Sequence, residues 1–299
     1  MVTVFLRGGL GNQMFQYAAG LALAKKRGDE LRLDTVFLSD RFPRRYFTFR
    51  TFDLEDVFMI EPRLTPLSRL ASAVRIPGFW LGIDLLEMNL GKGMGTVNIA
   101  YQNEREGFEG NIFPTAKNIV LYGRWESERY FADAKSDVRD AFQFRHALSG
   151  EAERIRTMVR SSNSVSVHIR RNDFLGKERE GGKAVNVGKI YYDSAFEHLA
   201  SRVKDPHYFV FSDDVEWCKK NISLPSVVYL DSATAGPKAS FHLALMSQCK
   251  HNVIANSTFS WWGAWLNQNP EKIVVAPRHW PQLSEKAGRD VVPRGWVGL

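Results

Sequence analysis

Residues 164–174 read Ser-Val-Ser-Val-His-Ile-Arg-Arg-Asn-Asp-Phe, and the interpretation of the whole chain starts from them. Three β-branched apolar residues alternate with serines and a histidine, a pattern that predicts a short buried strand. The strand leads directly into Arg170 and Arg171, and guanidinium groups are almost never fully buried without a partner. Two interpretations follow. Either the arginines form a diphosphate clamp, because a planar donor fork matches phosphate oxygens two at a time, or they pair with Asp173 and other nearby carboxylates in a surface loop.

The size and composition of the chain indicate a folded protein with an anionic partner. Its 299 residues are enough for one large domain or two modest ones, and 44% hydrophobic with 12% aromatic residues supports a packed core. The net charge of +7 favours nucleic acid, an acidic membrane face or a phosphorylated metabolite as partner. Nucleic acid is disfavoured, because no basic helix with groove-reading spacing and no RNA-binding signature is present.

The two cysteines, Cys218 and Cys249, lie in helix-like stretches, which favours a reducing compartment over a disulfide framework. No apolar run approaches the roughly 20 residues that cross a bilayer. The apolar stretch 14–24 is not typical of a signal peptide, because a strand and a glycine turn come before it. A cytoplasmic protein is therefore expected, with peripheral association with the inner membrane face as a further expectation from the basic charge.

The chain opens with a strand, a turn, a helix and a second strand. Residues 2–6 predict a strand, and the glycine-rich stretch 8–11 breaks it. Asn12 is expected to cap a helix that runs to about Lys26, and residues 31–34 resume an extended pattern. This order is typical of a βαβ unit.

Two uses of this opening are possible in principle. Gly9-Leu10-Gly11 begins the dinucleotide fingerprint and Asp34 stands near the position of its ribose-binding acid, but Met14 replaces the third glycine. The same turn also brings backbone close to a ligand, with Asn12 and Gln13 offering amides at a helix N-terminus. A tight turn without a ligand is the remaining alternative.

The second half of the chain alternates strands with helices, which predicts a parallel doubly wound sheet. Each of its five expected strands ends in polar residues, and the carboxyl ends of parallel strands meet at one edge of the sheet. A nucleotide-sized site is therefore expected along that edge. Residues 37–116 give no clear pattern beyond short helices and loops, and residues 145–150 are the expected domain boundary.

Two of these strand ends carry candidate ligand-binding groups. The hydroxyls of Ser257, Thr258 and Ser260 lie where a strand gives way to a helix, so they form either an anion seat or only a helix cap. Asp213 and Asp214 are placed to accept from a guanine or a ribose, or else to cap the helix that follows.

Several common catalytic patterns are absent from the sequence. There is no Asp-x-Asp triplet to hold a diphosphate through a divalent cation, and no P-loop. His/Cys zinc spacing and the G-x-S-x-G elbow of serine hydrolases are also missing. Arginine is thus expected to neutralise a leaving diphosphate electrostatically.

Four stretches together resemble one family. Residues 8–17, Gly-Gly-Leu-Gly-Asn-Gln-Met-Phe-Gln-Tyr, are similar to the N-terminal signature of the bacterial α-1,2-fucosyltransferases, glycosyltransferase family 11. Residues 168–173 resemble the HxRRxD motif of α-1,2- and α-1,6-fucosyltransferases. Residues 211–214 and 256–263 resemble the two remaining motifs. The similarity runs from residue 2 to about residue 280, and residues 37–116 match no motif.

The resemblance implies an α/β, GT-B-like fold with two facing, doubly wound Rossmann-like domains. Residues 1–149 would form the acceptor side and residues 150–299 the donor-binding domain, with the last helix packing back on the first. The implied reaction is inverting transfer of L-fucose from GDP-β-L-fucose to the 2-hydroxyl of a terminal β-galactoside, giving an α-1,2 linkage without a metal or other cofactor. The alternatives are an α-1,6-like GDP-sugar transferase, a nucleotide- or glycan-binding protein without turnover, and a NAD-type oxidoreductase.

The resemblance also assigns roles to residues. Arg170 would hold the β-phosphate, and His168 with one acid of the 213–214 pair would hold the guanosine. Asn12 would reach the phosphate–fucose region. The candidate donor-binding set is His168, Arg170, Arg171, Asp213, Asp214, Asn256, Ser257, Thr258, Phe259, Ser260, Gly11, Asn12 and Gln13, with Arg170 and Asn12 also counted as catalytic.

Inversion requires an acceptor for the proton of the attacking hydroxyl. Asp173 is the first candidate base, and its rival role is to orient an arginine by a salt bridge. Glu178, ten residues after His168, is the alternative base, at the place where related α-1,6 enzymes have one. Trp125 and Glu126 are the acceptor-binding candidates. Lactose, an O-antigen repeat and a lipid-linked glycan all remain open as acceptors.

Overall fold

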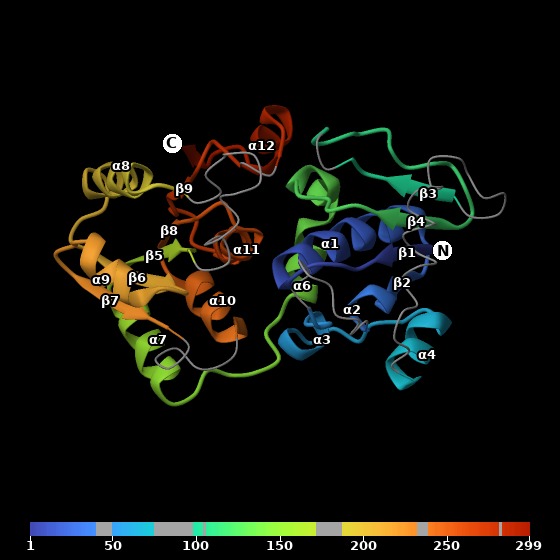
Figure 1. The fold of residues 1–299 in the computed structure, drawn as a ribbon, viewed down its shortest axis with the longest axis horizontal. Helices are drawn as coiled ribbons and strands as arrows, with labels where there is room; N and C mark the ends of the chain where they lie inside the picture. The colour runs from blue at the N-terminus through green and yellow to red at the C-terminus, as the bar shows by residue number, and fades with distance from the viewer. Residues whose placement is uncertain (40–49, 75–97, 104–105, 172–186, 232–238, 281–282) are drawn as a thin grey trace. The chain divides into compact units, whose positions relative to one another are not determined.

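The computed structural model describes residues 1–39, 50–74, 98–103, 106–171, 187–231, 239–280 and 283–299. The chain divides into two compact units, Met1–Arg145 and His146–Leu299, whose elements are labelled in Figure 1. Asp173 and Glu178, the two candidate bases, lie outside the described residues.

The first unit is built on a parallel sheet of four strands in the order β2-β1-β4-β3. β2 lies on one side of β1, and β4 and β3 lie on its other side, so the carboxyl ends of β1 and β4 flank a topological switch point. The strands are β1 (Val2–Phe5), β2 (Leu31–Asp34), β3 (Asn98–Tyr101) and β4 (Ile119–Tyr122). The helices are α1 (Leu10–Arg27), α2 (Val36–Ser39), α3 (Leu54–Val57), α4 (Pro66–Val74), the 3-10 helix η2 (Glu128–Ala134) and α6 (Lys135–Ala141).

Helix α1 starts earlier than the sequence predicted. Gly9 is its N-cap residue, without a side-chain cap, so Asn12 lies within the first turn and the prediction that it caps the helix was wrong. Gly8 has a φ of +79°, and a Cβ there would stand 2.5 Å from Asn12 Nδ2. Only glycine fits this turn, because other residues rarely adopt such a φ and the side chain of Asn12 fills the adjacent space.

The second unit contains a parallel sheet of six strands in the order β10-β9-β8-β5-β6-β7. Counted along the chain, this is the 3-2-1-4-5-6 order of Rossmann domains, with the switch point between β5 and β8. The strands are β5 (Asn163–Ile169), β6 (Pro206–Ser212), β7 (Val227–Leu230), β8 (His251–Val253), β9 (Val274–Ala276) and β10 (Val297–Gly298). The helices are α7 (Glu151–Ser161), α8 (Lys189–Ala200), α9 (Val215–Asn221), α10 (Ala239–Gln248), α11 (Thr258–Leu266) and α12 (Glu285–Val291).

Strand β5 is buried on both faces, as expected for a central parallel strand. Val165 and Val167 are fully buried in the apolar core of the unit. The intervening serines are buried too, and each accepts a hydrogen bond: Ser164 Oγ from the backbone N–H of Lys250 at 3.0 Å, and Ser166 Oγ from Asn252 Nδ2 at 2.6 Å. The alternation that the sequence shows is therefore between apolar and satisfied polar groups, not between core and solvent.

The predicted fold class, α/β with two Rossmann-like units of the GT-B type, is confirmed by the two parallel sheets. The sequence did not predict β3 or β10. Residues 128–141 form two helices, η2 and α6, with a non-helical residue at Phe131. None of the helices in the described ranges is long and apolar enough to cross a membrane.

Candidate active site

Arg170 and Ser257 meet across the switch point of the second sheet. Arg170 follows β5 and Ser257 follows β8, and the two strands are neighbours in the sheet. Arg170 Nη1 donates to Ser257 Oγ at 3.3 Å. Ligands of doubly wound proteins bind at this place, outside the carboxyl ends of the strands where the strand order reverses. The contact therefore joins a guanidinium to the position where the fold binds ligands.

Ser257 also stands at the N-terminus of α11, where the backbone N–H groups of the first turn favour an anion. It is the N-cap residue, yet its side chain does not cap the helix. The hydroxyl accepts from Arg170 instead, so the alternative that it serves only as a helix cap is not supported. Asn256 and Ser260 are buried beside it, 3% and 1% exposed, and Ser260 Oγ donates to the carbonyl of Ser257 at 3.3 Å.

Arg171 is directed to the other side of β5. Its backbone N–H donates to Asp213 Oδ1 at 2.8 Å, and its Nε donates to Asp214 Oδ2 at 3.2 Å. The guanidinium carbon lies 3.9 Å from the centre of the Trp217 ring, within cation–π range. The two arginines therefore do not form one paired clamp, because adjacent residues of an extended segment point to opposite sides.

Asp213 and Asp214 hold their own part of the unit together. Asp214 Oδ1 accepts from the backbone N–H of Trp217 at 3.1 Å, and this caps α9 as one of the two interpretations of the sequence expected. Its other oxygen, Oδ2, accepts from Arg171 Nε, so both carboxylate oxygens of Asp214 make contacts within the protein. Asp213 is the exposed acid of the pair, and its Oδ1 accepts from the backbone N–H of Arg171.

His168 is a neutral group beside the arginine. Burial lowers the pKa of His168 to about 3, and the positive charges of Arg170 and His242 act in the same direction. Its Nδ1 atom is buried and has no hydrogen-bond partner in the described structure. The ring lies 5.9 Å from that of Phe259 in α11, so two of the predicted donor-binding residues are in contact range here.

The glycine turn of the first unit gives Gln13 a structural role. Its Nε2 donates to the carbonyls of Gly8 at 3.0 Å and Thr51 at 2.8 Å, and its Oε1 accepts from the N–H of Asp53 at 3.0 Å. The side chain is fully buried, so it fixes the turn rather than presenting an amide to a ligand. Gly11 is buried in the first turn of α1, next to the half-buried Asn12.

Trp125 and Glu126 follow β4, at the switch point of the first sheet. Trp125 has a φ of +59°, which is unusual outside glycine, and is entirely buried. Its ring stacks on Phe113 with centroids 5.6 Å apart and meets Tyr130 edge to face at 4.9 Å. A buried ring cannot stack on a sugar, so the structure does not support the expected acceptor contact through Trp125. Glu126 is 9% exposed, and its Oε1 atom lies 3.9 Å from Nη1 of Arg124.

Asp34 is not placed as a ribose-binding acid. Its Oδ1 accepts from the N–H of Val36 at 3.0 Å and from Ser68 Oγ at 3.2 Å. Desolvation by burial raises the pKa of Asp34, and these hydrogen bonds oppose that rise. The carboxylate joins the start of α2 to α4, which removes the main support for the dinucleotide interpretation.

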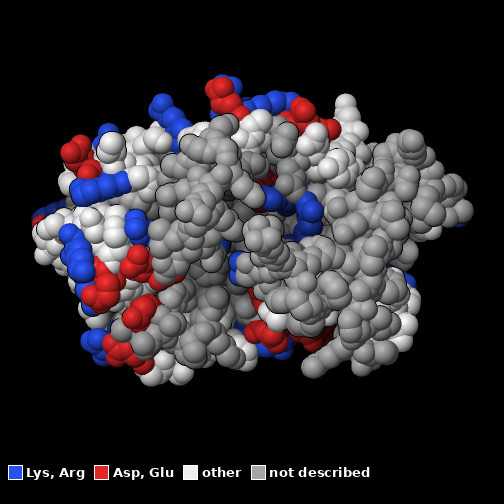
Figure 2. All heavy atoms as spheres, in the orientation of Figure 1, with Lys and Arg blue, Asp and Glu red and all other residues white. Residues whose placement is uncertain are grey.

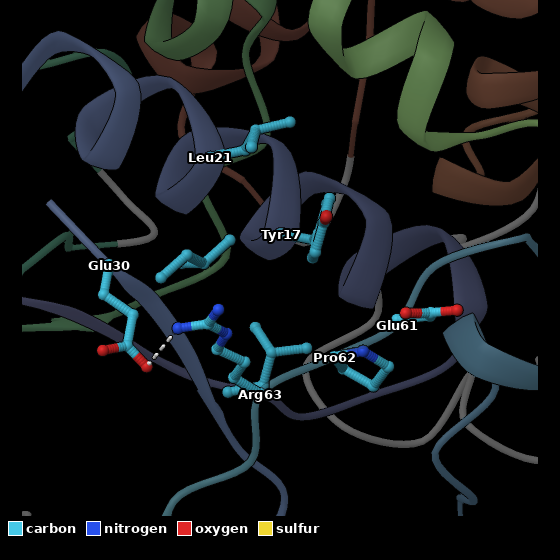
Figure 3. A pocket seen from close by; sticks show the side chains of 8 residues that line it. Tyr17, Leu21, Glu30, Glu61, Pro62 and Arg63 are labelled. Carbon is cyan, nitrogen blue, oxygen red and sulfur yellow. Dashed lines mark ion pairs between the residues drawn. The ribbon is translucent and has the colours of Figure 1, made fainter. Parts of the chain in front are cut away.

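A pocket of about 350 Å³ lies in the first unit, against α1 and the edge strand β2 (Figure 3). Tyr17 and Leu21 of α1 contribute to its walls, and Glu30 and Arg63 form an ion pair at 3.3 Å across it. Glu30 and Arg63 thus partly neutralise each other's charge within the pocket. The pocket is lined by none of the residues that meet at the switch points.

Basic and acidic side chains alternate over the second unit on the face shown in Figure 2. The described residues in this view form no broad basic field of the kind that binds nucleic acid. Among the described residues, no three His, Cys, Asp or Glu side chains are grouped as metal ligands would be.

The chain is similar to known glycosyltransferases along most of its length. The chain is 30% identical over 312 residues to an α-1,2-colitosyltransferase of Escherichia coli, covering all of this chain and 99% of that protein. It is 28% identical over 274 residues to human galactoside α-(1,2)-fucosyltransferase 1, covering 88% of this chain and 65% of that one. The fucosyltransferase NodZ from Bradyrhizobium is structurally similar, with a TM-score of 0.47 and 13% identity over 88% of this chain and 92% of that one. The model of Glycosyl transferase family 11 matches residues 1–299, and the chain therefore belongs to this glycosyltransferase family.

Proposed function

We propose that this glycosyltransferase moves L-fucose from GDP-β-L-fucose to the 2-hydroxyl of a terminal β-galactoside, with inversion and without a metal. The observation that carries the proposal is the Arg170–Ser257 contact at the mouth of α11. There a guanidinium, a hydroxyl and the N-terminus of a helix converge on the place where a doubly wound sheet binds ligands.

Departure of GDP requires stabilisation of the charge that develops on the β-phosphate. A guanidinium and helix N–H groups supply such charge stabilisation in advance, without reorganising when the bond breaks. Arg170 would bind the β-phosphate, while Ser257, Thr258 and the N–H groups of the first turn of α11 would bind the remaining phosphate oxygens.

The guanosine would lie on the β5–β6 side of the phosphates. His168 stays neutral over the physiological range, so its buried Nδ1 is suited to a hydrogen bond with an uncharged group of the nucleoside. Asp213 is exposed next to it along the sheet edge and would accept from the guanine N–H groups or a ribose hydroxyl.

The relatives support an α-1,2 linkage but differ in the sugar. One is named for colitose and the other for fucose on a galactoside. Colitose is fucose without its 3-hydroxyl, so GDP-colitose is the second candidate donor. A site that hydrogen-bonds the 3-hydroxyl rejects the deoxy sugar strongly, because its polar groups are then left unpaired.

The acceptor hydroxyl attacks C1 of fucose as the bond to the β-phosphate breaks, and its proton passes to a carboxylate. We assign this role to Asp173, with Glu178 as the alternative base. Asp173→Asn is expected to reduce turnover while leaving GDP affinity within about twofold, because the base acts on the acceptor and not on the nucleotide. Near-normal turnover in this variant would transfer the role to Glu178, which Glu178→Gln then tests.

The proposed activity is tested by incubating the protein with GDP-fucose and a panel of acceptors. The panel contains lactose, a galactose-terminated O-antigen repeat and a lipid-linked glycan, with maltose as a control lacking galactose. Fucose on the galactose 2-hydroxyl of at least one member is the expected product. Transfer only from GDP-colitose would replace the donor, a 6-linked product would favour the α-1,6 alternative, and GDP binding without any product would favour a binding protein.

Metal independence is tested in the same assay. Rates in excess EDTA are expected to equal those in magnesium or manganese, because the proposed clamp neutralises the diphosphate with protein charges. Loss of transfer in EDTA that manganese restores would contradict this part of the proposal.

A further inference from the structure

The contacts of Arg171 separate it from the leaving group that Arg170 faces. Its partners, Asp213, Asp214 and Trp217, all follow β6, whereas the partner of Arg170 follows β8. These two strands lie on opposite sides of β5 in the sheet. The adjacent guanidiniums are therefore directed away from each other along the sheet edge.

The charge of Arg171 is also balanced within the protein. Its guanidinium is 3.2 Å from the Asp214 carboxylate, and the two side chains are only 24% and 25% exposed. The indole of Trp217 covers one face of the guanidinium. A guanidinium that is paired and stacked in this way has little charge left to offer to a diphosphate.

The backbone contact explains what these interactions position. Ile169 ends β5 inside the sheet, and the N–H of Arg171 is held by Asp213 at 2.8 Å. Arg170 lies between these two fixed residues, Ile169 and Arg171. The direction in which its side chain leaves the backbone is therefore constrained by both neighbours. Trp217 and Asp214 belong to the N-terminus of α9, which gives the anchor a rigid base.

We infer that Arg171 is a positioning residue: by its bonds to Asp213 and Asp214 and its stacking on Trp217, it holds the end of β5 so that Arg170 faces Ser257. The inference deepens the proposed function and rests on GDP as the nucleotide part of the donor. It assigns to Arg171 an action through Arg170 in place of a direct contact with the diphosphate.

The test measures GDP and GMP affinities by calorimetry for Arg171→Met, Asp214→Asn and the double variant. Asparagine keeps an oxygen to cap α9 but loses the charge that binds Arg171. Each single variant is expected to lower the preference for GDP over GMP by about three- to tenfold, while GMP affinity stays within about twofold. The double variant is expected to be no worse than the more affected single one, because both changes break the same anchor.

Two further variants separate the anchor from general damage. Trp217→Leu is expected to lower the same preference, because it removes the ring that covers the Arg171 guanidinium while keeping the backbone N–H that donates to Asp214. Arg154→Met is the matched control, since Arg154 forms an exposed ion pair with Glu151 within α7. It is expected to leave both affinities unchanged. Misfolding would lower the binding stoichiometry and leave the ratio of the two affinities as it is.

Three results would overturn the inference. Arg171→Met could match the wild type, or the losses of the two single variants could multiply in the double one. In the third, Arg171→Met would lose as much GDP preference as Arg170→Met while Asp214→Asn behaved as wild type, which identifies Arg171 as a direct ligand. If the wild type bound neither nucleotide, the proposed function would fall instead. The anchor would then be judged from the same cycle in thermal unfolding of the free protein, where additivity of Arg171 and Asp214 would overturn it.

Discussion

At the N-terminus of α11, the side chain of the N-cap serine does not cap the helix. Ser257 accepts from Arg170, whereas Ser284, at the same position of α12, accepts from the backbone N–H of Ala287 at 3.2 Å. The two serines thus offer a matched pair within one unit. One hydroxyl faces the candidate site and the other stabilises a helix.

We predict opposite effects for alanine at these two positions. Ser257→Ala is expected to weaken GDP binding by about three- to tenfold, the worth of one hydrogen bond near a charged group, with little change in Tm. Ser284→Ala is expected to cost about 1 kcal/mol of stability and to leave GDP affinity unchanged. Calorimetry and thermal unfolding of both variants check this. A lower Tm with normal GDP affinity in Ser257→Ala would show that its hydroxyl caps α11 after all.

The half-buried imidazole of His168, whose Nδ1 atom is shielded from solvent, leads to a prediction about pH. Because its pKa is about 3 when folded and about 6.5 when unfolded, the unfolded chain takes up a proton first as the pH falls. Stability is therefore expected to fall between about pH 6.5 and pH 3, by up to about 1.4 kcal/mol per pH unit. His168→Gln removes this contribution, so denaturant unfolding should show a flatter pH dependence below pH 6. An unchanged slope would mean that His168 is already protonated in the folded protein.

Residue types were easier to predict from the sequence than their directions. The sequence placed Arg170, Ser257 and His168 at one sheet edge, and the structure brings them together there. The sequence also left open whether the arginines pair with carboxylates. In the structure, Arg171 forms such a pair with Asp214. This division between neighbouring arginines depends on which strands flank β5, which no local pattern contains.

At the scale of elements, the glycine turn before α1 is fixed by a buried amide. Gln13 satisfies the backbone of Gly8, Thr51 and Asp53 with three hydrogen bonds. The sequence suggested a ligand-facing amide, because glutamine at a helix N-terminus is equally compatible with both roles. What decides between them is the segment at residues 50–53, about 40 residues away in the chain.

We predict that Gln13→Leu destabilises the protein without weakening GDP binding. The leucine removes three hydrogen bonds to part-buried backbone groups, two carbonyls and one N–H, which is expected to cost about 1–3 kcal/mol. Gln143→Leu is the control, because Gln143 is exposed and its side chain donates to the carbonyl of Arg139 at an exposed position of α6. Denaturant unfolding and calorimetry with GDP measure the two effects. Normal stability with weakened GDP binding would instead indicate that Gln13 binds the donor substrate.

Helix starts were predicted less well than strands. The sequence placed the start of α1 at the best capping residue, Asn12, but the helix begins at Leu10 behind a glycine N-cap. The N-cap residue is a glycine without a side chain, so side-chain capping preferences do not locate the start of this helix.

For the whole molecule, the alternation of strands and helices was enough to predict a parallel doubly wound sheet in the second half of the chain, whereas two Rossmann-like units were implied only by the family resemblance. The order of the strands was not predicted, since it depends on contacts between segments distant in the chain. Strand β10, which pairs with β9, has only two residues, and two residues are too few to show any periodicity. Strand β3 lies in the stretch for which the sequence gave only short helices and loops.

The central claim is that the guanidinium of Arg170 stabilises the leaving diphosphate at the N-terminus of α11. It is tested most directly by measuring fucose transfer from GDP-fucose by Arg170→Met beside Arg154→Met. We predict that Arg170→Met lowers kcat by about 10²–10³-fold, as removal of one charge-stabilising donor does, while Arg154→Met matches the wild type. Transfer by a folded Arg170→Met protein at a rate close to that of the wild type would contradict the account.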